Sequence, residues 1–245
     1  MGPLFESDSV ATIAHRGGAN HRPENTLAAF DYAVDLGADM LELDIHRTAD
    51  DHLVVHHDPT VDRTTDGSGA IADMPLETLQ SLDAGYGFGP DDEPSPYRDL
   101  QIPRLETVLE RYSVPMVVEL KDDRIDPASF VGVLERTGRL ESVVIGGFDD
   151  ELLAAVRERA PVVSGLGMAE SRALVDDPTM DPPAEVLFPP VELLTADVVQ
   201  TGHDAGLTVV PWTVNEPSEM ERAIDLGVDG IVTDDPKRLL SLQSG

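Results

Sequence analysis

Short apolar runs alternate with amphipathic stretches along almost the whole chain, and this rhythm limits the possible folds more than any other feature. Strands that alternate with helices predict parallel βαβ units, and eight such pairs predict a closed (β/α)8 TIM barrel, an α/β fold. An open doubly wound sheet is the structural alternative, but the glycine-rich dinucleotide turn that would favour it is missing from the sequence. The predicted strands are 10–14, 40–45, 114–120, 142–146, 162–166, 186–188, 207–212 and 230–233, and the predicted helices are 25–36, 104–112, 127–137, 149–159, 170–175, 196–205, 217–226 and 236–240.

Two segments interrupt the alternation. Leu53–His57 follows the second strand too closely for a parallel crossover, so we expect an antiparallel hairpin return that ends at the barrel rim. The next segment, 58–101, is rich in Gly, Pro and Asp and separates the second strand from its helix. We interpret it as a long structureless insertion on the C-terminal face, serving as a lid or specificity element. The whole chain, 1–245, is then one barrel domain.

The charge is strongly negative, with 17 Lys+Arg against 47 Asp+Glu and a net charge of −30. Nucleic-acid binders need a basic surface, so this balance argues against a nucleic-acid partner and against stable association with an anionic membrane. The two lysines are Lys121 and Lys237. An acid-rich, lysine-poor chain is typical of proteins that work in a high-salt cytoplasm, where salt screens self-repulsion. An ordinary acidic protein with a cation-binding role is the alternative.

The sequence also limits the chemistry and the cellular location. It contains no cysteine, which excludes disulfides, thiolate metal sites and a cysteine nucleophile. It has no long apolar run that would span a membrane, and residues 1–8 do not resemble a secretory signal. We therefore expect a cytoplasmic protein. The sequence does not indicate the oligomeric state.

Three acidic residues lie where the predicted strands end. Glu42 and Asp44 are two residues apart on one strand and therefore share a face, and Glu119 lies on the next parallel strand. Carboxylates that point into a barrel are costly to ionise together without a cation. Three of them suit a hard, oxygen-preferring ion, Mg²⁺ or Ca²⁺, with Mn²⁺ as a further candidate. A solvated acidic rim is the alternative interpretation.

Two histidines near these carboxylates are candidates for an acid/base pair. His15 follows the first strand and His57 ends the hairpin, and imidazole titrates near neutral pH. His56 and His57 alternate, so only one of them can face the site, and Asp58 is positioned to orient His57. A structural hydrogen-bonding role is the simpler interpretation for a lone histidine.

Two cationic residues accompany the acidic group. Arg16 follows His15, and Lys121 lies two residues after Glu119. Arginine offers paired donors and lysine a point charge, so both suit a phosphate group. Balancing the charge of the carboxylates is the alternative, and the two roles are compatible. Glu24 precedes the first predicted helix and is a candidate to hold a loop or a ligand.

Short motifs occur along residues 10–240 in an order that resembles the glycerophosphodiester phosphodiesterase family, whose fold is a barrel of the phosphatidylinositol-phospholipase-C type. They are His15-Arg-Gly17, Pro23-Glu-Asn-Thr26, Glu42-Leu-Asp44, His57-Asp58, Arg63-Thr-Thr65, Val118-Glu-Leu-Lys121, Pro211-Trp-Thr-Val-Asn215 and Gly230-Ile-Val-Thr-Asp234. Any one of these motifs is weak evidence, whereas the ordered set is specific.

The resemblance implies roles for individual residues. It matches Glu42, Asp44 and Glu119 to metal ligands, His15 and His57 to catalytic histidines, and Arg16 and Lys121 to residues near the phosphate. It also matches Trp212 to a tryptophan near the substrate, for which a barrel-core aromatic is the alternative. Asn215 and Asp234 match the family pattern but receive no role.

The resemblance implies metal-dependent hydrolysis of a small glycerophosphodiester to an alcohol and glycerol phosphate. The nucleophile is either water or the glycerol 2-hydroxyl, and the resemblance favours the hydroxyl, which gives a cyclic phosphate intermediate. One histidine would act as base and the other as acid, in an order that the sequence leaves open. A lysophospholipase-D-like phosphodiesterase and a non-catalytic barrel that binds phosphate or cations are the alternatives.

Overall fold

A computed structural model of the protein describes residues 5, 9–89, 96–165 and 184–244. All eight predicted strands occur, and β3 is the return strand of the predicted hairpin. Leu166 and the predicted helix 170–175 lie outside the described residues. The strands are β1 Ala11–Ala14, β2 Met40–Arg47, β3 Leu53–Val55, β4 Met116–Leu120, β5 Val143–Gly147, β6 Val163–Ser164, β7 Val186–Leu187, β8 Thr208–Val209 and β9 Gly230–Thr233.

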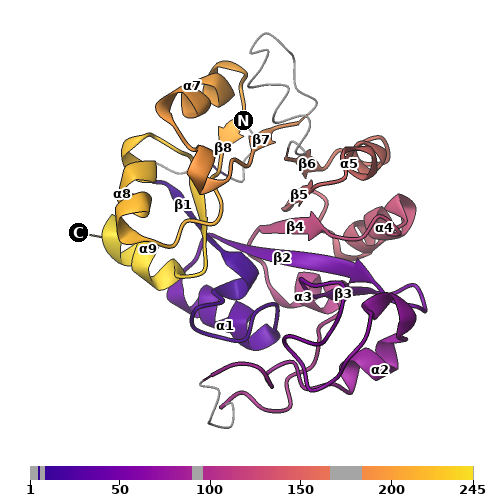
Figure 1. Ribbon diagram of the computed structural model, residues 1–245. Coiled ribbons are helices and arrows are strands. Elements are labelled where there is room, and N and C mark those ends of the chain that lie inside the picture. The colour runs from indigo at the N-terminus through magenta and orange to yellow at the C-terminus, as the bar shows by residue number, and fades with distance from the viewer. Residues whose placement is uncertain (1–4, 6–8, 90–95, 166–183, 245) are drawn as a thin grey trace.

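The parallel strands follow one another around a ring, as the predicted barrel requires (Figure 1). Six of them form one sheet in the order β6-β5-β4-β2-β1-β9, and β7 pairs with β8. A parallel bridge between Gly165 and Val186 joins β6 to β7. The amide of Val232 donates to the carbonyl of Pro211 at 3.0 Å, which joins the segment after β8 to β9. Backbone hydrogen bonds therefore link the two sheets at both seams, and the chain has the α/β barrel fold.

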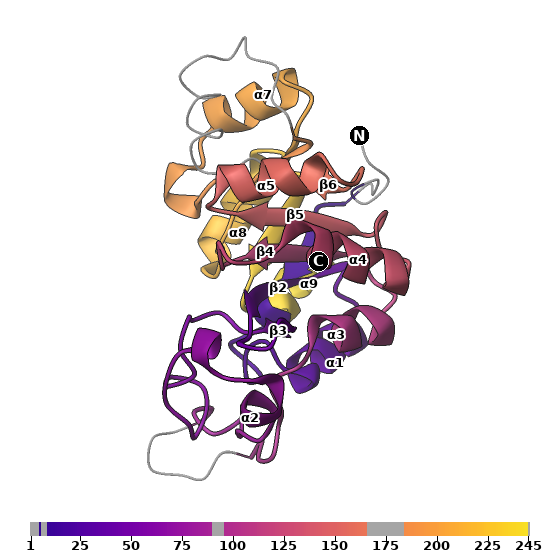
Figure 2. The same cartoon turned by 90° about the vertical axis from the view of Figure 1, so that its right-hand side faces the viewer.

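Helices cover the outside of the strands, and Figure 2 shows α5, α4 and α3 beside β5, β4 and β2. Their boundaries follow local chemistry: Thr26 and Asp126 cap α1 and α4 by accepting backbone N–H groups, and proline opens α4, α8 and α9. The helices are α1 Leu27–Leu36, α2 Leu76–Gln80, α3 Leu105–Arg111, α4 Pro127–Thr137, α5 Asp150–Arg157, α7 Ala196–Asp204, α8 Pro217–Asp225 and α9 Pro236–Gln243, with 3-10 turns at His15–Gly17, Ile71–Asp73 and Val191–Leu193.

Apolar side chains fill both the barrel and the layer between strands and helices. The interior cluster takes residues from strands all around the ring, which is the packing expected of a filled barrel. A second cluster packs the strands against α1 and α3–α5, and a third packs them against α7–α9. The interior cluster comprises Phe5, Ala11, Ile13, Met40, Val117, Val144, Val186, Val210 and Val232.

The insertion 58–101 differs from the expected structureless loop. It contains the 3-10 turn Ile71–Asp73 and helix α2, and its buried residues Val61, Ile71 and Leu79 form a small core together with Val54 of β3 and Ile102. The high content of Gly, Pro and Asp in this segment hides the helix at the level of sequence, because α2 has only 5 residues. The described part of the insertion projects at one end of the molecule (Figure 2).

The β2–β3 hairpin has the predicted geometry. β3 pairs antiparallel with the end of β2, with His46 opposite Val54 and Arg47 opposite Leu53. The amide of Thr48 donates to the carbonyl of His52 at 2.9 Å and closes the turn. The chain therefore returns to the rim of the barrel at residues 56–58, beside the strands that carry the acidic residues.

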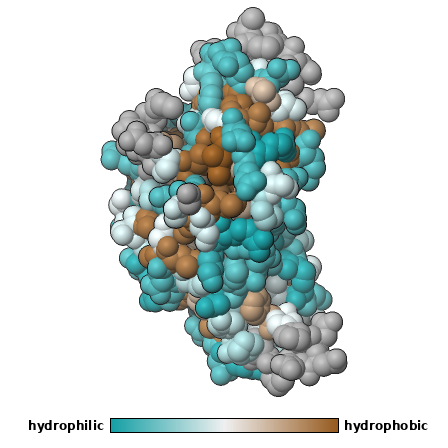
Figure 3. Space-filling view, turned by 90° about the vertical axis from the view of Figure 1, so that its left-hand side faces the viewer, coloured by the Kyte–Doolittle hydropathy of each residue, from teal (hydrophilic) through white to brown (hydrophobic). Residues whose placement is uncertain are grey.

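The face of the molecule drawn in Figure 3 is mainly hydrophilic. Figure 3 shows the side that carries α8 and α9 in Figure 1, where apolar residues gather in a patch near the middle of a mostly polar face. Among the described residues, no helix is both long enough and apolar enough to cross a membrane.

Candidate active site

Strand register brings the three predicted acidic residues together. In the β2–β4 pair, Asp44 is the direct partner of Glu119, and Glu42 lies two residues earlier on the same face of β2. One oxygen from each of the three carboxylates lies within 4.8 Å of the other two. The sequence signal, alternation on one strand and a matching position on the next, was sufficient to predict this convergence.

The three carboxylates are withdrawn from water. Glu42 and Asp44 are buried, and Glu119 is largely so. Burial is the main reason that the pKa values of Glu42 and Glu119 are raised, and the charge of Asp44 raises both further. Oδ1 of Asp44 accepts no hydrogen bond from the described residues, and Lys121 Nζ lies 3.4 Å from it as an ion-pair partner. A cluster of this kind favours a cation, and its oxygen-only donors fit Mg²⁺, Ca²⁺ or Mn²⁺.

The turn after β1 places a main-chain donor and a guanidinium beside the acidic cluster. Arg16 has a left-handed backbone with φ of 50°, and its N–H donates to Glu42 Oε2 at 2.9 Å. Its Nε lies 3.3 Å from Asp44 Oδ2. Gly17 also has positive φ, and a Cβ at this position would lie 2.7 Å from the Cβ of Ala29. The His-Arg-Gly sequence therefore reflects a turn that only glycine can complete.

Lys121 lies on the opposite side of the cluster from the turn after β1. Its Nζ is 2.7 Å from Glu119 Oε1 and 3.4 Å from Asp44 Oδ1. Burial lowers the pKa of Lys121, but Asp44 and Glu119 more than offset this effect, so the pKa is raised and the ammonium stays charged. Both predicted cationic residues thus contact the acidic cluster.

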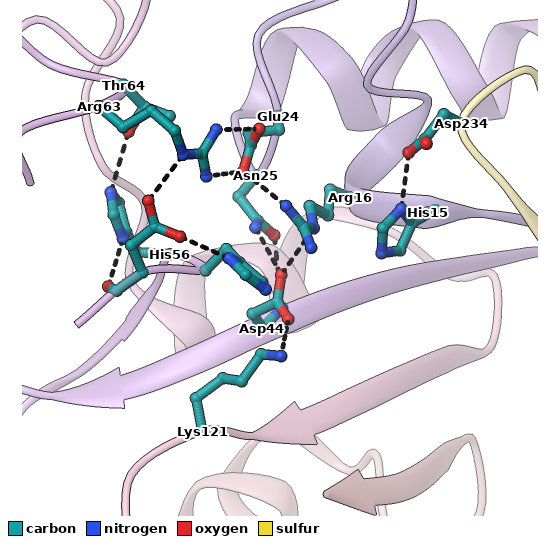
Figure 4. A network of polar contacts seen from close by, with 12 residues as sticks. His15, Arg16, Glu24, Asn25, Asp44, His56, Arg63, Thr64, Lys121 and Asp234 are labelled. Atoms are coloured by element: carbon teal, nitrogen blue, oxygen red, sulfur yellow. Dashed lines mark hydrogen bonds and ion pairs between the residues drawn. The ribbon is translucent and has the colours of Figure 1, made fainter. Parts of the chain in front are cut away.

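His15 is held by a carboxylate from the far end of the chain. Its Nδ1 lies 2.6 Å from Asp234 Oδ1 (Figure 4). Its Nε2 lies 3.9 Å from Glu42 Oε2. Asn215 donates to the other oxygen of Asp234 at 2.7 Å. Burial lowers the pKa of His15, but Glu42 and Asp234 outweigh it and the net shift is upward. Asp234 and Asn215 belong to motifs in the sequence. The sequence alone does not indicate that Asp234 contacts His15, because the two residues are 219 positions apart and only the closed barrel brings them together.

His57 is held in the same way by its sequence neighbour. Its Nδ1 lies 2.6 Å from Asp58 Oδ1, the contact expected from the sequence. Burial is the main cause that lowers the pKa of His57. The other two histidines here are structural: His56 bonds to Thr64 Oγ1 at 3.0 Å, and His46 bonds to the carbonyl of His57 at 2.9 Å.

The loop before α1 completes the polar side. Asn25, with φ of 58°, donates from its amide to Asp44 Oδ2 at 2.8 Å, while Thr26 caps the helix. Glu24 accepts hydrogen bonds from Arg16 at 3.0 Å and from two nitrogens of Arg63 at 2.7 Å (Figure 4). Glu24 therefore holds the loop before α1 in place, which is one of the two roles expected for it from the sequence.

The cleft also has an apolar side that the sequence revealed only in part. Trp212 lines it, and its ring N–H donates to the carbonyl of Phe188 at 2.9 Å. Phe188 and Phe148 line it too, and Phe148, half exposed, meets Trp212 edge-on with ring centroids 6.0 Å apart. His15, Glu42 and Glu119 line the same cleft. It can hold a molecule with a charged group on one side and an apolar portion on the other.

Comparisons with known proteins show which proteins this chain resembles. The model of the glycerophosphoryl diester phosphodiesterase family matches residues 15–238. A glycerophosphodiester phosphodiesterase from Caldanaerobacter subterraneus subsp. tengcongensis is 37% identical, covering 94% of this chain and 96% of its own. A human lysophospholipase D is 29% identical, covering 93% of this chain and 84% of its own.

Solved structures show the same similarity in three dimensions. The structure of an Oleispira antarctica phosphodiesterase in complex with the product sn-glycerol-3-phosphate is similar with a TM-score of 0.85 and 26% identity, covering 98% of this chain and 99% of that one.

Proposed function

This chain belongs to the glycerophosphoryl diester phosphodiesterase family, and from that premise we propose that it hydrolyses small glycerophosphodiesters to an alcohol and glycerol phosphate with the help of a divalent cation. The chain is a phosphodiesterase. The observation that carries the cation proposal is the convergence of three carboxylates, two buried and one partly buried, within 4.8 Å of one another.

Glu42, Asp44 and Glu119 would hold the cation. When bound, it supplies positive charge that keeps the carboxylates ionised and stabilises negative charge on the phosphoryl oxygens. The donor set fits a hard ion, because it consists of carboxylate oxygens alone. Arg16 and Lys121 add two further positive groups beside the cluster, where they would bind the phosphate.

His15 and His57 would transfer the protons. Each ring has Nδ1 bonded to a carboxylate, which leaves Nε2 to exchange a proton with the substrate. One ring takes the proton of the attacking oxygen as the new P–O bond forms, and the other gives a proton to the departing alkoxide as the old bond breaks. The attacking oxygen is a water or the glycerol 2-hydroxyl, and the hydroxyl route gives a cyclic phosphate that water then opens.

The insertion 58–101 and the aromatic side of the cleft would select the substrate. Residues 58 and 63 bring the insertion to the polar network, and Phe148, Phe188 and Trp212 offer apolar surface to the non-phosphate part. The same apolar surface is the observation that favours the second candidate, a lysophospholipase-D-like activity, since a lysolipid carries an acyl chain.

A turnover assay separates these candidates. Purified enzyme is incubated with glycerophosphocholine or with lysophosphatidylcholine, in EDTA and then with Mg²⁺, Ca²⁺ or Mn²⁺, and released choline is measured. We expect faster release from glycerophosphocholine, and only with added cation. Preference for the lysolipid would favour the second candidate. Cation binding without turnover of either substrate would favour a non-catalytic barrel and contradict the proposal.

A further inference from the structure

Arg63 makes three hydrogen bonds from the insertion to carboxylates that serve the active site. Its Nε donates to Asp58 Oδ2 at 2.7 Å, and its Nη1 and Nη2 donate to the two oxygens of Glu24 at 2.7 Å each. We propose that Arg63 is a positioning residue that sets the geometry of His57 and Arg16 at once. The inference rests on the proposed function, because it takes the roles of His57 and Arg16 from it.

Arg63 is linked to His57 through Asp58. Asp58 accepts from Arg63 on one oxygen and bonds to Nδ1 of His57, at 2.6 Å, on the other. The hydrogen bond from Arg63 is the largest cause that holds the pKa of Asp58 well below its usual range. Asp58 is thus kept as a carboxylate with fixed orientation, and the imidazole that it holds is fixed in turn.

Arg63 is linked to Arg16 through Glu24. Oε1 of Glu24 accepts from both Arg63 Nη2 and Arg16 Nη1, at 2.7 and 3.0 Å. Arg16 extends from this carboxylate toward Asp44, where its Nε lies 3.3 Å from Oδ2. Without Arg63, Glu24 would lose the paired hydrogen bonds that fix its plane, and Arg16 would lose a rigid partner.

The arrangement requires arginine and not only a positive charge. A guanidinium presents its nitrogens in one rigid plane, and here three of them point at two carboxylates (Figure 4). A lysine ammonium at the same place would contact one carboxylate well and the other poorly. Arg63→Lys therefore tests the geometry separately from the charge.

The backbone around Arg63 is held by contacts that do not involve its side chain. The hydroxyl of Thr65 donates to the carbonyl of Val61 at 2.8 Å, and Thr64 is bonded to His56. Val61 is buried in the small core of the insertion. The side chain of Arg63 itself is 47% exposed. Substitutions at this position should therefore leave the fold intact.

The experiment measures kcat and KM for glycerophosphocholine in Arg63→Ala, Arg63→Lys and the matched control Arg98→Ala. Arg98 is an exposed arginine of the same insertion, against the ring of Tyr86. We expect Arg63→Ala to lower kcat about 10- to 100-fold, with little recovery in Arg63→Lys and no change in Arg98→Ala. Added guanidinium chloride, which can enter the exposed site, should restore part of the activity of Arg63→Ala, whereas tetramethylammonium chloride should not.

Two results would overturn the inference. One is kcat and KM of Arg63→Ala within about twofold of Arg98→Ala. The other is a lowered activity of Arg63→Ala that guanidinium does not restore, which would indicate general structural damage. If Arg63→Ala does not fold, a kcat of Arg63→Lys equal to that of wild type would also overturn the inference. When one of these results is obtained, His57→Ala, measured in parallel, shows whether the proposed function fails too. If His57→Ala is inactive, only the role of Arg63 is wrong; if it is active, the proposed function is wrong as well.

Discussion

The two sides of the cleft are built from different parts of the barrel and offer a substrate different surfaces. The polar side, which includes His15, Glu42 and Glu119, comes from the ends of β1, β2 and β4. Ion pairs and hydrogen bonds connect it to Arg16, Lys121 and the β2–β3 hairpin. The apolar side comes from residues after β5, β7 and β8, which are Phe148, Phe188 and Trp212.

This difference assigns different tasks to the two sides. Charged groups with fixed partners can stabilise a developing charge and move protons, because their orientation is set before the substrate arrives. Aromatic surface gives binding energy without fixing a reacting atom. We therefore expect substitutions on the polar side to lower kcat and substitutions on the apolar side to change KM.

The largest effect should come from the two imidazoles. His15→Ala and His57→Ala should each lower kcat about 100- to 10,000-fold, because each removes a proton-transfer group. His52→Ala is the control, since that histidine lies at the hairpin turn near Asp50. Steady-state kinetics with added Mg²⁺ or Ca²⁺ and circular dichroism spectra of all three variants give the answer. Near-wild-type activity in both His15→Ala and His57→Ala would contradict the assignment of proton transfer to the polar side of the cleft.

The next effect should come from the lysine of the polar side. Lys121→Met should lower kcat about 100-fold, because it removes a positive group beside the phosphoryl oxygens. Lys237→Met is the matched control, since the chain has only these two lysines and Lys237 is exposed. Equal activity of the two variants would show that Lys121 only balances the charge of Glu119 and Asp44.

A smaller effect should mark the apolar side. Phe148→Ala should raise KM several-fold, roughly in line with the loss of one half-buried aromatic contact, and leave kcat nearly unchanged. Leu193→Ala, which removes another exposed apolar side chain, should change neither constant. A fall in kcat without a change in KM for Phe148→Ala would contradict the assignment of binding to this side.

The smallest effect should concern the surface of the whole molecule. With a net charge of −30, the folded chain repels itself, and KCl screens this repulsion. The melting temperature, measured in EDTA so that cation binding does not contribute, should rise between low and molar KCl. A melting temperature that is independent of KCl would contradict the expected adaptation to high salt.

The polar side could be predicted from the sequence more completely than the apolar side. The alternation of Glu42 and Asp44 along β2 is a local signal, because strand geometry converts sequence spacing directly into a shared face. The position of Glu119 near the end of the next parallel strand then places it beside them. Asp58 is the neighbour of His57, so its role was visible as well. Asp234 was not assigned a role, because its contact with His15 depends on the ring closing between β9 and β1.

Phe148, Phe188 and helix α2 show why the rest could not be predicted. An aromatic residue after a strand fits a barrel core as well as a cleft, and only the packing around it decides between them. Helix α2 is short and stands in a segment whose composition favours turns, although Pro75 followed by Leu76-Glu-Thr-Leu79 is a helix-start pattern.

Direct titration with Mn²⁺, followed by electron paramagnetic resonance, tests the central claim that the three converging carboxylates hold a cation. The comparison is between wild type, Glu119→Gln and the control Glu106→Gln, whose carboxylate pairs with Arg104 and Arg136 away from the cleft. We predict one strong site in wild type and in Glu106→Gln, weakened at least about tenfold in Glu119→Gln. Equal Mn²⁺ affinity in all three proteins would contradict the account.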